Sequence, residues 1–203
     1  MNAIKIFFFR LGTFLMLFFR LYQVNSWLYR WTFRRKYLKY PVSTYSSFDE
    51  LAAFIKTLEW IKDGWQQRGD AFDYPEAVEY IGRYGDKKIG DCDEFAVYIA
   101  TALQKSVDAK QMSGVDRIRI LTVTWIGADG KGGGHNVCLM HFPDVSLPGR
   151  SYGYMDYSLP HSYPSVPETV KGVVEHYSPG GTCTGYGVLD PRTLATLEYH
   201  WKL

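Results

Sequence analysis

Hydrophobic positions in the middle of the chain follow the period of an α-helix. Phe48, Leu51, Phe54, Ile55, Leu58 and Ile61 recur at three- and four-residue spacing. Ser47 followed three residues later by Glu50 forms a capping-box pattern at the start of this run. The pattern predicts a helix over 48–63 with one face packed on a core.

Two further helices are predicted before residue 110. Pro75 suits the first turn of a helix that continues through Glu76–Ile81 and ends at the glycines 82 and 85. From Asp91 to Lys105, apolar residues again recur at helical spacing, and Asp91 with Glu94 forms a second capping box. Cys92 is therefore predicted to lie in the first turn of a capped helix, directly after the loop 85–90.

Downstream the hydrophobic period changes from helical spacing to alternation. Runs of alternating character cover Ile118–Trp125, Val137–Phe142 and Tyr152–Leu159, and Asp129-Gly130 and Pro148-Gly149 separate them. This pattern predicts an antiparallel meander. Residues 160–187 are rich in Pro, Gly, Ser and Tyr and are interpreted as a long irregular excursion, and 188–203 is expected to end in a further strand with Leu197, Tyr199 and Trp201 on one face. The predicted fold class is α+β, with helices first and an antiparallel sheet second.

Charge divides the chain near residue 40. Residues 1–40 contain eight Lys and Arg and no acidic residue, whereas the remainder contains 15 basic and 21 acidic residues. Residues 41–47 are short and polar and mark the candidate boundary. Two units are expected: a basic, aromatic-rich hydrophobic segment over 1–40 and a domain over 41–203.

The segment 1–40 combines apolar and basic residues in a way that suits a membrane interface. Phe, Leu, Ile and Met dominate residues 4–24, but Lys5, Arg10 and Arg20 interrupt them, which weakens a spanning helix without excluding it. Residues 27–40 interleave aromatic and basic side chains. Membrane association, spanning or interfacial, with the domain on the cytoplasmic side is the preferred hypothesis. Docking on the domain or on a protein partner is the alternative, and no nucleic acid is expected as a partner.

The cysteines give no sign of a disulfide framework or of a structural metal. There are three, and no pair has Cys-x-x-Cys spacing. Cys138 lies in a strand pattern and is interpreted as a buried apolar residue, and Cys183 as incidental. No metal or cofactor is expected.

A nucleophilic site is the chemistry that the sequence favours. A thiol at a helix start lies near the positive end of the helix dipole, so the pKa of Cys92 is expected to fall if a histidine joins it, although Asp91, Asp93 and Glu94 oppose this. His135 follows a glycine-rich loop and opens an apolar run, and Asp156 lies in the next strand pattern. The candidate catalytic residues are therefore Cys92 as nucleophile, His135 as base and Asp156 as the residue that orients the imidazole. His141, His161, His176 and His200 are interpreted as structural or surface residues.

Three segments resemble the signature of a known superfamily. Gly-Asp-Cys-Asp-Glu-Phe-Ala at 90–96, Gly-His-Asn-Val at 134–137 and Met-Asp-Tyr at 155–157 are similar to the motifs of transglutaminase-like cysteine peptidases. The segment 73–78, Asp-Tyr-Pro-Glu-Ala-Val, also resembles the one that precedes the cysteine in the bacterial transglutaminase-like cysteine proteinases. The resemblance covers roughly 48–160 and implies a papain-like fold.

The resemblance implies a thiol-dependent hydrolase that cleaves peptide or amide bonds of a protein or peptide substrate through an acyl-enzyme. Acyl transfer to an amine by the same triad, as in a transglutaminase or an amidase, and a non-catalytic binding module that keeps the fold remain as alternatives. The backbone N–H of Cys92 is expected to supply one oxyanion donor. Trp60, Trp65, Gln66 and Gln67 are candidates for the second donor.

Overall fold

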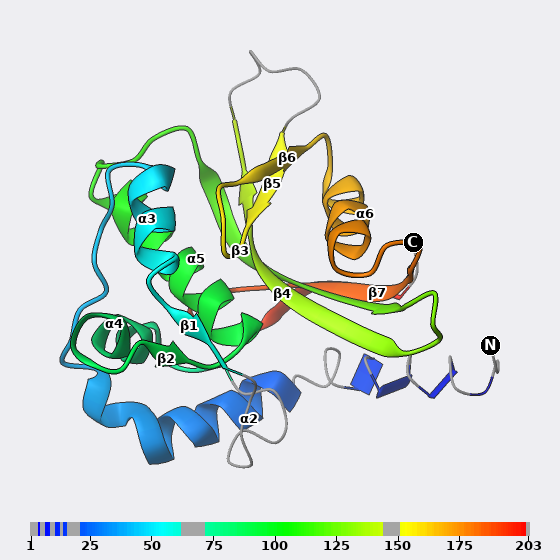
Figure 1. Ribbon diagram of the computed structural model, residues 1–203, viewed down its shortest axis with the longest axis horizontal. Helices are drawn as coiled ribbons and strands as arrows, with labels where there is room; N and C mark the ends of the chain where they lie inside the picture. The colour runs from blue at the N-terminus through cyan, green and yellow to red at the C-terminus, as the bar shows by residue number, and fades with distance from the viewer. Residues whose placement is uncertain are drawn as a thin grey trace.

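The protein folds as a mixed α+β structure around one antiparallel sheet (Figure 1). The structure, a computed structural model, describes residues 4, 7–8, 11–12, 14–15, 21–61, 72–143 and 151–201. The sheet has six strands in the order β6-β5-β4-β3-β7-β8. The α+β expectation is confirmed.

The first half of the sheet is the predicted meander. β3 (Asp116–Ile126) pairs with β4 (Gly132–His141) through a turn at Asp129-Gly130, and β5 (Tyr152–Met155) pairs with β4. The turn at Pro148-Gly149 lies outside the described residues. Beyond β3, the sheet continues with β7 (Thr182–Leu189) and then β8 (Thr196–His200). The further strand predicted near the end of the chain is β8.

Alternation along the strands gives the sheet two buried faces. Ile118 and Ile120 of β3 pack in the core shared with α3 (Phe48–Ile55), α4 (Pro75–Tyr84) and α5 (Cys92–Asp108). Leu121 and Val123 point the other way, into a second core beneath α6 (Val166–Tyr177). Figure 1 shows α3, α4 and α5 together on one side of the sheet and α6 on the other. Because successive side chains of a strand point to opposite faces, one sheet serves both layers.

The helix predicted over 48–63 is shorter than expected. It ends at Ile55, and the Thr57 hydroxyl donates to the Phe54 carbonyl just beyond that end. Two residues later, β1 (Glu59–Trp60) pairs in parallel with β2 (Lys88–Ile89). The apolar spacing of Leu58 and Ile61 continues the helical pattern, but pairing with β2 replaces helical hydrogen bonds there.

The interpretation of 160–187 as an irregular excursion is wrong. This stretch contains β6 (His161–Tyr163), the whole of α6 and the beginning of β7. Ser165 caps α6 by accepting a hydrogen bond from the Glu168 backbone N–H, and Pro167 lies in the first turn. Val170, Val173 and Val174 then recur at helical spacing and are buried. The Pro, Gly and Ser content of the flanking turns masked this short amphipathic pattern.

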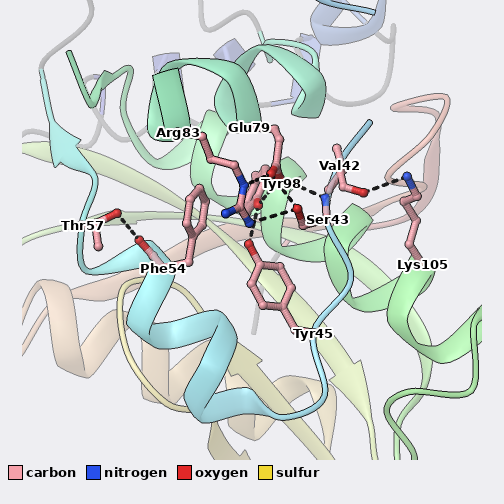
Figure 2. A network of polar contacts seen from close by, with 9 residues as sticks. All are labelled: Val42, Ser43, Tyr45, Phe54, Thr57, Glu79, Arg83, Tyr98 and Lys105. Atoms are coloured by element: carbon pink, nitrogen blue, oxygen red, sulfur yellow. Dashed lines mark hydrogen bonds and ion pairs between the residues drawn. The ribbon is translucent and has the colours of Figure 1, made fainter. Parts of the chain in front are cut away.

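The polar residues 41–47 are packed against the domain. In Figure 2 the Glu79 carboxylate of α4 accepts hydrogen bonds from the Ser43 backbone N–H (3.0 Å), the Ser43 hydroxyl (2.7 Å) and the Tyr98 hydroxyl (2.6 Å). Arg83 also bonds this carboxylate, and Tyr45 bonds Tyr98. Burial tends to raise the pKa of Glu79, but these hydrogen bonds outweigh it and hold the pKa below its usual value. The network fixes the beginning of the domain to both α4 and α5.

The described part of the N-terminal segment is helical and lies against the domain. α2 (Leu21–Tyr29) continues through a π-helical turn, η1 (Arg30–Arg34), and a 3₁₀ turn, η2 (Arg35–Tyr37). Among the described residues, no helix has the length and apolar character needed to cross a membrane.

Candidate active site

The N-terminus of α5 holds Cys92 through a complete capping box. The Asp91 side chain accepts from the Asp93 backbone N–H (3.2 Å), and the Glu94 carboxylate accepts from the Asp91 backbone N–H (3.0 Å). Gly90 lies against this Glu94 carboxylate, and a Cβ at position 90 would overlap it. The predicted capping box is confirmed, and the absence of a side chain at Gly90 is part of what makes room for it.

A buried hydrogen bond ties this helix terminus to the strand that carries His135. The Asn136 side-chain N–H₂ of β4 donates to Asp93 Oδ1, and both residues are buried. Because Asp93 follows Cys92 and Asn136 follows His135, this bond holds the two predicted catalytic residues on facing elements.

His135 lies beside Asp156, as the orienting role requires. His135 Nε2 is 3.7 Å from Asp156 Oδ2, slightly longer than a hydrogen bond, and both side chains are buried. Asp156 Oδ1 accepts from the Tyr157 backbone N–H (2.6 Å). Burial tends to raise the pKa of Asp156, but its contacts with His135, Tyr177 and the Tyr157 backbone outweigh burial and hold the pKa below its usual value. The carboxylate is therefore ionised at neutral pH beside the imidazole.

Tyr177 is a site residue that the sequence interpretation missed. It is the last residue of α6, its hydroxyl donates to Asp156 Oδ2, and its ring packs on His135 with centroids 3.8 Å apart. The same carboxylate oxygen thus faces both the imidazole and the phenol. The helical spacing of the valines in α6, together with the Ser165 cap, was the signal that would have placed a helix end at Tyr177.

The residues converge on one cavity of about 390 Å³. It is lined by Trp60, Asp91, Cys92, Gly134, His135, Tyr157 and Tyr177. Trp60 reaches it because β1 pairs with β2 just before the loop that leads to Cys92. Of the candidate second oxyanion donors, Trp60 therefore lies at the cavity, whereas Trp65, Gln66 and Gln67 fall outside the described residues.

The expectation of a low thiol pKa at Cys92 is wrong for this geometry. Burial raises the pKa of the Cys92 thiol well above its usual value, and the neighbouring Asp93 and Asp91 carboxylates raise it further. The Asn136 backbone lowers this pKa only in part. The thiol donates to Asp93 Oδ1 at 3.6 Å, so the resting cysteine is protonated. Burial and two flanking acids outweigh the favourable field of the helix terminus.

Asp91, Cys92 and Asp93 also have a spacing that can accept a cation. One ligand atom of each lies within 4.8 Å of the others. Asp93 Oδ1 already bonds Asn136 and Cys92, so this carboxylate is engaged in holding the site together. Acidic groups often gather without a metal, and the expectation that the site needs none stays a prediction.

The other cysteines lie away from this cavity. Cys138 is fully buried in β4, as predicted, and burial raises its pKa above the usual value. Cys183 lies in β7, where it pairs with Trp125, and its thiol donates to the Gly185 carbonyl. The sequence placed Cys183 in a loop, and the structure corrects this to a strand.

Neither the comparison with protein-family models nor the comparison with curated proteins finds a match for this chain. The resemblance to transglutaminase-like cysteine peptidases therefore rests on the three motifs themselves. What the structure adds is their arrangement: Cys92 and His135 line one cavity, and Asp156 lies behind His135.

Proposed function

We propose that the protein is a thiol-dependent hydrolase, a transglutaminase-like cysteine peptidase with a papain-like arrangement of helix and sheet. The observation that carries the proposal is the shared cavity of Cys92 and His135, with the ionised Asp156 carboxylate 3.7 Å from His135 Nε2. The proposed substrate is a peptide or amide bond in a protein or peptide, and no cofactor takes part.

In the proposed mechanism, His135 removes the thiol proton as the Cys92 sulfur attacks the carbonyl carbon. Because Nε2 faces Asp156, Nδ1 is the imidazole nitrogen that receives this proton. The imidazolium formed is stabilised by the Asp156 carboxylate, and His135 then protonates the leaving amine. A raised thiol pKa makes this base assistance essential, since little thiolate is present beforehand. His135 then takes a proton from a water molecule that attacks the thioester carbon, the carbon–sulfur bond breaks, and the proton passes to the Cys92 sulfur as the acid is released.

The oxyanion of the tetrahedral intermediate needs preorganised donors. The Cys92 backbone N–H lies in the first turn of α5, where helical backbone donors lack intrahelical partners. We assign the Trp60 indole N–H as the second donor, because Trp60 lines the same cavity. Removal of one such donor typically costs about 100-fold or more in turnover.

The test compares Cys92→Ala, His135→Ala and the control Cys183→Ala in the full chain. Hydrolysis of fluorescently labelled casein should be abolished in the first two and retained in the control, with unchanged circular dichroism in all three. Labelling of Cys92 by iodoacetamide should depend on proton removal by His135, so His135→Ala should slow that labelling. Full hydrolysis by the Cys92→Ala protein would refute the proposal. Incorporation of an added amine into product would indicate acyl transfer, and an inert Cys92 would indicate a binding module.

We also propose that residues 1–40 hold the enzyme at a membrane surface, with the catalytic domain on the cytoplasmic side. The segment carries eight basic residues and no acidic one, and several of its described apolar side chains, including Phe7 and Phe8, are exposed. Basic residues next to apolar ones are attracted to anionic headgroups by about 1 kcal/mol each. The full chain should accordingly sediment with vesicles that contain anionic lipid.

A further inference from the structure

The helix that begins at α2 is attached to the domain through its polar side. The Ser26 hydroxyl accepts from the Phe72 backbone N–H (3.0 Å), and Arg30 donates to the Phe72 carbonyl (2.8 Å) and the Asp73 carbonyl (2.6 Å). Arg34 forms an ion pair with the Asp73 carboxylate at 2.8 Å. Ser26, Arg30 and Arg34 follow one another at four-residue intervals, so they occupy one side of the helix.

The other side of this helix is apolar and faces outward. Trp27 is 61% exposed and Trp31 58%, and Val24 and Leu28 beside them are also exposed. Trp27 and Trp31 stack on each other with ring centroids 6.4 Å apart. We call Val24, Trp27, Leu28 and Trp31 the α2 face. This orientation is the reverse of an ordinary surface helix, which buries its apolar side on the protein.

The surroundings of the α2 face indicate what covers it. Arg35, Lys36 and Lys39 follow it directly and are exposed, and residues 1–40 contain no acidic side chain to neutralise them. Tryptophan is the residue that most favours the boundary between headgroups and acyl chains. A cationic rim beside exposed tryptophans complements an anionic bilayer better than a protein surface.

A cavity of about 620 Å³ opens beside the α2 face. Val24 and Trp27 line this cavity and also belong to the α2 face. The other lining residues include Arg30, Tyr74, Arg192 and Thr193. The carbonyl contacts of Arg30 use Nε and Nη2 and leave Nη1 outside these bonds. The Arg192 side chain is 74% exposed and lies 3.5 Å from Asp108. Two guanidinium groups in a cavity with apolar walls suit a phosphate group attached to a lipid.

We propose that the α2 face binds an anionic phospholipid bilayer and that Arg30 and Arg192 contact a headgroup phosphate in the adjoining cavity. The inference rests on the proposed membrane attachment and specifies where it occurs. The helix lies in the plane of the interface, with its polar side holding the domain and its apolar side in the headgroup region.

Vesicle sedimentation of the full chain tests this inference. The wild-type protein should bind phosphatidylcholine vesicles that contain phosphatidylglycerol more tightly than vesicles of phosphatidylcholine alone. Trp27→Ala combined with Trp31→Ala should lower the partition coefficient at least about ten-fold, and Arg192→Ala about five-fold. Leu197→Ala and Lys171→Ala alter an exposed leucine on β8 and an exposed lysine on α6 and should bind like the wild type.

The possible outcomes distinguish failure of this inference from failure of the proposed membrane attachment. If the wild type binds and the double tryptophan variant binds equally well, attachment occurs elsewhere and the assignment to the α2 face is overturned. Equal binding to neutral and anionic vesicles would overturn the preference for an anionic bilayer, and unchanged binding by Arg192→Ala would overturn the phosphate contact. If the wild type binds neither kind of vesicle, membrane attachment itself is refuted. Circular dichroism of each variant confirms that binding, and not folding, has changed.

Discussion

Single residues decide how the thiol of this site can react. Cys92 lies at a helix terminus, which favours a thiolate, yet burial and the Asp93 and Asp91 carboxylates raise its pKa well above the usual value. A sequence shows which acids flank a cysteine but does not show how deeply its sulfur is buried. His135 must therefore accept the thiol proton during the attack. The residues that position its imidazole are consequently important for turnover.

Tyr177 is predicted to be a positioning residue for His135 and Asp156. Tyr177→Phe keeps the ring against His135 but removes the hydroxyl that donates to Asp156, so turnover should fall about ten-fold with the fold intact. Asp156→Asn should cost far more, on the order of 1,000- to 10,000-fold, because the imidazole loses its carboxylate. Turnover measured against pH provides the decisive comparison. In Tyr177→Phe the acidic limb should move to higher pH, because a donor that lowers the pKa of Asp156 is lost. An unchanged profile would mean that Tyr177 only fills space.

Among the elements, the sequence predicted those whose signals are local. The capping box of α5, the start of α4 at Pro75 and the meander of β3, β4 and β5 all follow from spacing within a few residues. The early end of α3 could not be predicted from local spacing, because β1 ends the helical pattern by pairing with β2, a strand nearly thirty residues away in the chain. The attachment of α2 to residues 72–74 could not be predicted from local patterns either, since Ser26 and Phe72 are 46 positions apart.

This attachment predicts an unusual pH dependence of stability. Burial raises the pKa of Asp73 from 3.8 to about 6, although Arg34 and the Tyr74 backbone N–H oppose the shift. A carboxyl whose pKa is higher in the folded state stabilises the fold while protonated, and that contribution is lost as pH rises through about 6. The free energy of unfolding of the wild type should thus fall by roughly 2 kcal/mol relative to Asp73→Asn between about pH 4 and pH 7. Urea titrations of both proteins measure the difference. A constant difference across this range would show that Asp73 does not titrate there.

For the whole molecule, the three motifs predicted that Cys92, His135 and Asp156 lie close together. Cys92 opens α5, His135 lies in the first half of β4, and Asp156 directly follows β5. Cys92 and His135 line one cavity, and Asp156 lies behind His135. The other side of the site could not be predicted in this way. Tyr177 arrives from α6, which packs on the opposite face of the sheet from α5, and only the tertiary fold places that helix end beside Asp156.

The contacts of residues 21–40 with the domain bear on the predicted division of the chain near residue 40. Spacing and charge suggest that a chain beginning at Pro41 is soluble and active, but such a chain lacks Ser26, Arg30 and Arg34. A chain beginning at Leu21 keeps all three contacts but loses the ring contacts of Phe14 with Tyr199 and Trp201, so its loss of stability should be small. The chain beginning at Pro41 should lose roughly 3 kcal/mol at pH 8, because the Arg30 hydrogen bonds and the ion pair between Arg34 and Asp73 are lost. Near pH 5 the loss should be smaller, since Asp73 can then be protonated.

Thermal and urea unfolding of the three chains at both pH values measure these differences. Equal stability of the two shortened chains would show that residues 21–40 do not stabilise the domain.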